Sequence, residues 1–301
     1  MREFKGYFWF YLISAYVALA SGQTLPGENY ERFTCENGTY GSMALTETTG
    51  VISATASFVK VSDCDSLVRV EAIPTNSCVL RPPSAPVPEV RQIQTPSTIA
   101  PTIQYLDVGE AITVRGPGRE IVMKRQLSGP FTTYTFQEVR TPTIAELLNP
   151  TPNLGILAPG RLSISYPGGR DLGEFNGGLD FTPFRLTTPA QGATQSGSNP
   201  PSIEWSGLPS NIEKMPLFAT ISSMDSRQAW TMNCNVGTSG RSQFQIPTTT
   251  WNEIPATVRE SGSAAFALVP QIFVNLNAPG LDSGLLVSFP QIASTILMRR
   301  P

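Results

Sequence analysis

The chain has 301 residues, with 21 Lys and Arg against 23 Asp and Glu, and no histidine. This near-neutral balance predicts no basic face for nucleic acid or anionic lipid, and the lack of histidine excludes Ser-His-Asp and Cys-His catalysis and nearly all catalytic zinc sites. No Walker A, Gly-x-Gly-x-x-Gly or Ser-x-x-Lys motif is present. We therefore expect no catalytic residue, no metal site and no cofactor.

The amino terminus has the parts of a secretory signal peptide. Met1–Lys5 carries two positive charges, an apolar stretch runs from Tyr7 to Ala20, and Ala18-Leu19-Ala20 is an A-x-A cleavage pattern. The apolar stretch is shorter than the ~20 residues of a membrane span. We expect a leader over residues 1–22, a location that is secreted, periplasmic or at the cell surface, and no membrane contact once the leader is removed.

Apolar and polar residues alternate along the rest of the chain, which predicts short strands. The predicted strands are 52–58, 68–72, 111–114, 120–124, 133–138, 161–166, 202–205, 217–222, 241–246, 264–269, 273–276 and 285–289. Short helices are expected only at 143–148 and 251–254. The 27 Pro and 25 Gly mark many turns, so the pattern predicts an all-β protein with two immunoglobulin-like or fibronectin-like β-sandwich domains.

Two segments have the composition of connectors. Residues 81–101 are rich in proline and are predicted to be an exposed crossing within the first domain. Residues 187–201 consist mainly of Gly, Ser, Gln, Thr and Pro and are predicted to be a flexible linker. The predicted domains are therefore 23–186 and 202–301. A separate module over 23–80 stays open, although a piece of that length is marginal alone.

Four cysteines in an exported chain predict disulfides, because the destination is oxidising. Cys35 and Cys64 flank a strand-like segment and are predicted to close a local loop. Cys234 lies far from the other three and is either a bridge partner or a buried free thiol. A bridge between Cys64 and Cys78, with the other two cysteines free, is the competing arrangement.

The densest group of oxygen-bearing side chains is Asp171, Glu174, Asn176 and Asp180, in a glycine-rich segment. The segment is predicted to be a hairpin turn. Carboxylate and amide oxygens would also suit a ligand-binding or Ca²⁺-binding loop, although their spacing does not match the D-x-D-x-D-G pattern. Pairs of acids such as Asp171, Glu174 or Glu204 would also suit a polysaccharide hydrolase, which needs no imidazole.

Three tryptophans, Trp205, Trp230 and Trp251, could form a sugar-stacking surface. Trp205 and Trp230 alternate with polar neighbours, which predicts burial in the core. Trp251 stands beside Asn252 and Glu253 in a predicted turn, and it is the candidate surface aromatic.

Several short phrases each combine turn residues with a strand. They are Leu106-Asp-Val-Gly109, Ile112–Gly118, Leu157-Ala-Pro-Gly160, Asp171–Phe175, Ile203–Gly207, Phe244–Pro247 and Gly280–Gly284. Their order resembles a group of exported β-rich proteins from soil bacteria of the Acidobacteria type, over about residues 50–290. That group has no known activity, so the resemblance implies no catalytic or binding residues.

The resemblance implies cysteines near positions 78 and 234. With Cys35 and Cys64 assigned to the local loop, we predict a Cys78–Cys234 bridge that ties the first domain to the second. The glycosylation sequon at Asn37 is expected to be unused in such a host.

The favoured function is a non-catalytic exported protein that has a binding or structural role at the cell surface or outside the cell. Its partner would be a glycan or an envelope protein, bound by loops on a rigid scaffold. The alternative is a carboxylate-dependent polysaccharide hydrolase.

Overall fold

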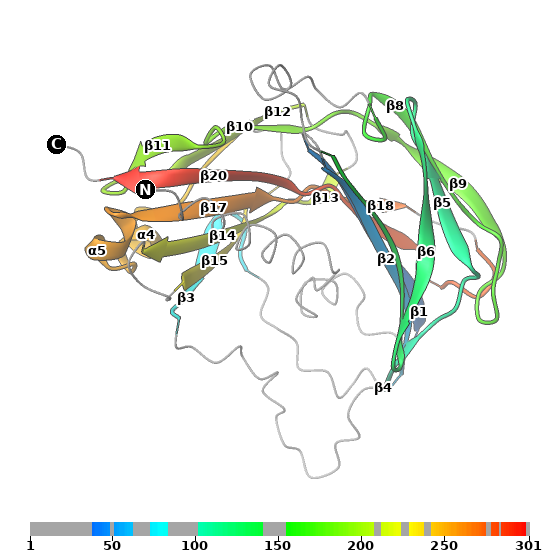
Figure 1. The fold of residues 1–301 in the computed structure, drawn as a ribbon. Helices are drawn as coiled ribbons and strands as arrows, with labels where there is room; N and C mark the ends of the chain where they lie inside the picture. The colour runs from blue at the N-terminus through cyan, green and yellow to red at the C-terminus, as the bar shows by residue number, and fades with distance from the viewer. Residues whose placement is uncertain are drawn as a thin grey trace, which may run out of the picture. The chain divides into compact units, whose positions relative to one another are not determined.

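The computed structural model describes residues 38–48, 51–62, 73–83, 102–140, 155–207, 212–223, 229–237, 242–274, 278–282 and 284–298. Strands make up 62% of the structure and helices 5%, which confirms the all-β prediction (Figure 1). No helix in these ranges is long and apolar enough to cross a membrane.

The chain forms two compact units whose segments alternate along the sequence. Unit 1 comprises Met1–Val70, Gln92–Phe181 and Val274–Val287, and unit 2 comprises Glu71–Arg91, Thr182–Phe273 and Ser288–Pro301. The predicted domains, 23–186 and 202–301, therefore differ from the units at 71–91, 182–186 and 274–287. The reason is that strand partners are chosen by hydrogen bonding and burial, and not by nearness in the sequence.

The strands of unit 1 belong to one sheet with the order β19-β1-β2-β7-β6-β5-β8-β9, in which β4 also pairs with β2; from β1 to β9 the pairs are antiparallel. Their bounds are β1 (Gly38–Thr48), β2 (Val51–Ser62), β4 (Thr102–Tyr105), β5 (Ala111–Arg115), β6 (Glu120–Ser128), β7 (Phe131–Val139), β8 (Gly160–Tyr166), β9 (Phe175–Phe181) and β19 (Leu285–Ser288). This curved sheet (Figure 1) replaces the two facing sheets predicted for this part of the chain, because period-two alternation shows which side of a strand is buried but not how many sheets bury it.

The inner side of this sheet is lined by aromatic rings. Phe58 lies 6.4 Å from Tyr134 and 5.6 Å from Tyr166 between ring centroids, in edge-to-face arrangements. Tyr166 and Phe175 are 5.4 Å apart. These rings join β2, β7, β8 and β9 into one core.

Unit 2 has two sheets, with the orders β11-β20-β17-β14-β15-β3 and β10-β12-β16, and a further pair formed by β13 and β18. The bounds are β3 (Ser77–Arg81), β10 (Arg185–Thr188), β11 (Ala193–Ser196), β12 (Ser202–Ser206), β13 (Ile212–Lys214), β14 (Pro216–Ser223), β15 (Ala229–Asn235), β16 (Gln243–Gln245), β17 (Gly262–Leu268), β18 (Gln271–Val274), β20 (Gln291–Met298), α4 (Thr248–Asn252) and α5 (Ala256–Arg259).

The predicted linker at 187–201 contains a strand. Within it, β11 runs parallel to β20, with Ala193 opposite Thr295 and Ser196 opposite Met298. Because β11 is an edge strand of its sheet, backbone hydrogen bonds hold it without an apolar pattern. The polar composition of the segment therefore predicted a linker, although the segment contains a strand.

Candidate functional site

Loops from three distant parts of unit 1 meet at residues 106–110, 167–174 and 278–282. The backbone N–H of Asp171 donates to the carbonyl of Asp107 at 3.1 Å, and the N–H of Gly173 donates to the carbonyl of Pro279 at 2.9 Å. Parts of three of the turn-and-strand phrases therefore lie together, and we call this set of loops the loop cluster.

Two aspartates join the first two loops. The backbone N–H of Asp107 donates to Oδ2 of Asp171 at 2.8 Å. The N–H of Gly109 donates to Oδ1 of Asp107 at 2.9 Å, within its own turn. Together with the Asp171–Asp107 backbone bond, these contacts use both carboxylates to fix the backbone.

Two arginines neutralise these carboxylates. Arg125 on β6 donates to Asp107 at 2.5 Å and to Glu110 at 2.5 Å. Arg170 donates to both oxygens of Asp171 at 3.1 Å. The bond from Arg170 holds the pKa of Asp171 below its ordinary value, and the backbone N–H of Asp107 acts in the same direction.

Tyr134, on β7, contacts the first loop through its hydroxyl group. Its buried hydroxyl accepts from the N–H of Val108 at 2.9 Å, and the carbonyl of Gly109 lies 3.0 Å away as an acceptor for its proton. A second possible acceptor, Oδ1 of Asp107, is 3.3 Å away. Burial raises the pKa of Tyr134 to about 12, so this group is a fixed neutral donor at physiological pH.

Glycines allow the loop backbones to approach each other. A Cβ on Gly169 would lie 2.3 Å from the nitrogen of Gly109 and 2.5 Å from the carbonyl oxygen of Asp107. Gly168 also has a φ of +87°, which disfavours other residues. The glycine-rich sequence at 168–169 is therefore explained by close packing.

The third loop is fixed to β1. Oδ2 of Asp282 accepts from the N–H of Thr39 at 2.9 Å, and the hydroxyl of Thr39 donates to the carbonyl of Gly280 at 2.5 Å. Hydrogen bonds thus join the loops of the cluster to one another and to β1, while the side chains of Arg170, Glu110 and Glu174 extend toward solvent.

The structure does not bring the predicted ligand loop together. Asp171 lies in the loop cluster, and Glu174 is exposed before β9. Asn176 and Asp180 are exposed on one side of β9, roughly 13 Å apart at about 3.3 Å per residue, and Asp180 lies 3.8 Å from Arg161. No group of three or more metal-binding side chains occurs in the described ranges. The predicted hairpin turn is instead a loop followed by the strand Phe175–Phe181.

Trp251 was predicted at the surface, but the structure buries it completely, at 0% exposure. It lies in the one-turn helix α4, and its indole N–H donates to the carbonyl of Gly197 at 2.9 Å. The polar neighbours that suggested exposure, Asn252 and Glu253, point outward from the other side of the turn. Trp205 is buried as predicted, and Trp230 packs half-buried against the same core.

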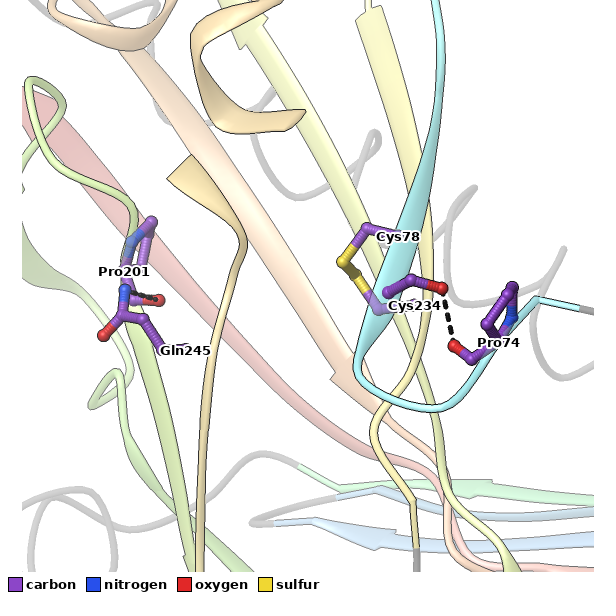
Figure 2. Close-up of a disulfide and its surroundings, with 6 residues drawn as sticks. Pro74, Cys78, Pro201, Cys234 and Gln245 are labelled. Carbon is purple, nitrogen blue, oxygen red and sulfur yellow. Dashed lines mark hydrogen bonds between the residues drawn. A yellow bond between two sulfur atoms is a disulfide. The ribbon is translucent and has the colours of Figure 1, made fainter. Parts of the chain in front are cut away.

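The predicted Cys78–Cys234 disulfide is present (Figure 2). The cysteines are direct neighbours on β3 and β15, with Cα atoms 4.0 Å apart. Both strands lie in unit 2, so the bridge closes one unit and does not tie two domains together as predicted. Cys35 and Cys64, like the Asn37 sequon, lie outside the described residues.

Glu204, the third acid considered for hydrolysis, lies on β12 in unit 2. It accepts from the hydroxyl of Thr188 at 3.1 Å and from that of Ser202 at 3.5 Å.

The sequence pattern did not single out Asp107, Arg125 or Tyr134. The available signal was the Asp-Val-Gly turn at 107–109, which is typical of a side chain bonding its own backbone. No pattern connected it with Asp171, which is 64 residues away. No protein-family model matches the chain, and a search of curated proteins finds no relative.

Proposed function

We propose that the chain is an exported, non-catalytic protein that binds a glycan or an envelope protein through the loop cluster. The observation that carries this proposal is the contrast within the cluster. Its loops are joined by backbone hydrogen bonds and anchored to Tyr134, while Arg170 and Glu174 extend into solvent. Exposed charges on loops that a rigid sheet positions are suited to recognition, because little flexibility is lost on binding.

The state of the carboxylates supports a non-catalytic role. Asp107 and Asp171 are each bonded to an arginine and to backbone N–H groups. The bond from Arg170 lowers the pKa of Asp171, so this group is even less suited than an ordinary aspartate to donate a proton.

Export and the immunoglobulin-like fold are parts of the same proposal. The leader pattern of 1–22 and the disulfide support export. Unit 2, which has two sheets, is the part that suits a sandwich. Amino-terminal sequencing of protein recovered from the producing cells would find a start near Ser21–Gln23, and an intact Met1 would contradict export by this leader.

The binding proposal is tested with paired charge variants. Arg170→Ala with Glu174→Ala removes two exposed charges of the loop cluster. Arg161→Ala with Asp180→Ala removes a matched pair of charges at the end of β8 and β9 that is far from the loop cluster. On a glycan array and in pull-downs from the cell envelope, the first variant should lose at least about tenfold in affinity, and the second should bind like the parent. Equal binding by both variants would contradict the assignment.

The alternative proposal is a carboxylate-dependent polysaccharide hydrolase that uses Glu174 or Glu204. Release of reducing ends from a polysaccharide panel, abolished by Glu174→Gln or Glu204→Gln, would replace the binding proposal.

A further inference from the structure

The β6–β7 hairpin extends beyond the strands on either side of it. β5 pairs with β6 only as far as Lys124, and β2 pairs with β7 only as far as Tyr134. The two hairpin strands continue together to Ser128 opposite Phe131. Residues 126–133 are therefore a two-stranded ribbon without a further strand partner in the described part of the chain, and we call them the arm.

The tip of the arm has apolar side chains on both of its faces. Leu127 is 69% exposed and lies opposite Thr132, while Phe131 is 49% exposed and lies opposite Ser128. Because neighbouring residues of a strand point to opposite sides, Leu127 and Phe131 are on different faces. A shallow groove on another molecule would cover one of these side chains and leave the other in water.

The turn at the tip of the arm is not crowded by other atoms of the protein. Gly129 has a φ of +58°, and no atom would lie within 4 Å of a Cβ placed there. Pro130 follows, exposed, and the ring of Phe131 is supported from one side by Tyr105 at 5.0 Å. The tip is thus a small, fixed apolar point.

From Ile121 to Gln137 the hairpin carries only positive charges, those of Lys124 and Arg125. The acidic residues beside its base, Asp107 and Glu110, are paired with Arg125, which fixes the base of the arm. Lys124 is exposed, roughly 13 Å behind Ser128 at about 3.3 Å per residue. A long amine at that distance can reach lipid phosphates while the tip lies about 5–10 Å deep in the interface.

We propose that the arm inserts Leu127, Pro130 and Phe131 into the interfacial region of a lipid bilayer, with Lys124 at the phosphate level. The contact is peripheral and orients the protein on a membrane surface. It does not depend on a ligand at the loop cluster. The net charge of the chain does not predict this membrane contact, because the contacting surface is a small apolar tip and not a basic face.

The test uses co-sedimentation of the exported chain with phosphatidylcholine vesicles at millimolar lipid, alone and with one-fifth phosphatidylglycerol. The parent protein should bind both, and bind the anionic vesicles more strongly. Leu127→Ser with Phe131→Ser should weaken binding by at least about tenfold. Val139→Ser is the matched control: it is 67% exposed at the other end of β7, and its binding should not change.

A second measurement does not depend on losing binding. Phe131→Trp places an indole at the tip, and its fluorescence should shift to the blue when vesicles are added. No vesicle binding by the parent protein, no blue shift, or an equal loss in the Val139→Ser control would overturn the proposal. Capture of an envelope protein that the serine variant loses, without vesicle binding, would assign the arm to a protein partner instead.

Discussion

The two units fix their loops by different means. In unit 1, the loop cluster is held by carboxylates, arginines and the hydroxyl of Tyr134. In unit 2, the edge strand β3 is held by the Cys78–Cys234 bridge, and a short helix is held by the buried Trp251. Hydrogen-bonded loops respond to pH, whereas a covalent bridge does not, so the two units should fail under different conditions.

The aromatic residues let each unit be followed separately. Three of the four tryptophans, Trp205, Trp230 and Trp251, lie in unit 2, and the fourth, Trp9, lies in the predicted leader. Unit 2 contains no tyrosine. Tryptophan fluorescence of the exported chain therefore reports unit 2, and tyrosine absorbance reports unit 1.

The largest expected effect is loss of the bridge. Cys78→Ala with Cys234→Ala opens a loop whose ends are 156 residues apart, which in the chain-entropy model costs about 5 kcal/mol of unfolding free energy. Urea unfolding followed by tryptophan fluorescence should shift to lower concentrations. Cys35→Ala with Cys64→Ala is the control, and it should leave the tryptophan transition in place.

Truncation of Trp251 should come next. Trp251→Ala leaves a large cavity and should cost about 3–5 kcal/mol. Thermal unfolding followed by circular dichroism measures this loss. A cost below about 1 kcal/mol would mean that the side chain is at the surface, as the sequence had predicted.

Unit 1 should be the alkali-sensitive unit. Burial raises the pKa of Tyr134 and of Tyr166 to about 12, from an ordinary value of 10.0. Below pH 10 both tyrosines are neutral in the folded and unfolded states. Between pH 10 and 12 the unfolded state ionises first, so stability falls by about 1.4 kcal/mol per pH unit for each tyrosine. Urea titrations at pH 9 and 11.5 should show this shift in the tyrosine signal, with a smaller shift in the tryptophan signal.

The smallest effect separates the two tyrosines. Tyr134→Phe leaves the N–H of Val108 without its bond and should cost about 1–3 kcal/mol. The hydroxyl of Tyr166 is buried with no hydrogen-bond partner, so Tyr166→Phe should be neutral or stabilising. Equal losses in the two variants at pH 7 would contradict the role assigned to Tyr134 in the loop cluster.

Strands were predictable where inward residues are large and outward residues are polar. β2, β8 and β12 follow that pattern and were predicted. β20 was missed because its buried positions include Ala293 and Thr295, which are small or polar. β9 was missed because Gly177 and Gly178 are typical of turns, although an edge strand tolerates them. The predicted strand at 68–72 and helix at 143–148 lie outside the described residues.

The candidate site was predictable only in part. Asp171 was singled out for its neighbours in the sequence, but its actual partners, Asp107 and Arg170, include one from a distant loop. The sequence also did not show in which direction a side chain points. Trp251 stands beside exposed polar residues yet faces the core, because one turn of helix presents both sides within four residues.

The interleaving of the units has a consequence for synthesis of the chain. Unit 1 is completed only by Val274–Val287, and unit 2 only by Ser288–Pro301. The final strand, β20, is an interior strand of its sheet, between β11 and β17. Neither unit can therefore reach its final form before residues 274–298 have left the ribosome. A stop codon shortly before Gln291 would remove that central strand, and the shortened product would be a substrate for proteases rather than a smaller stable protein.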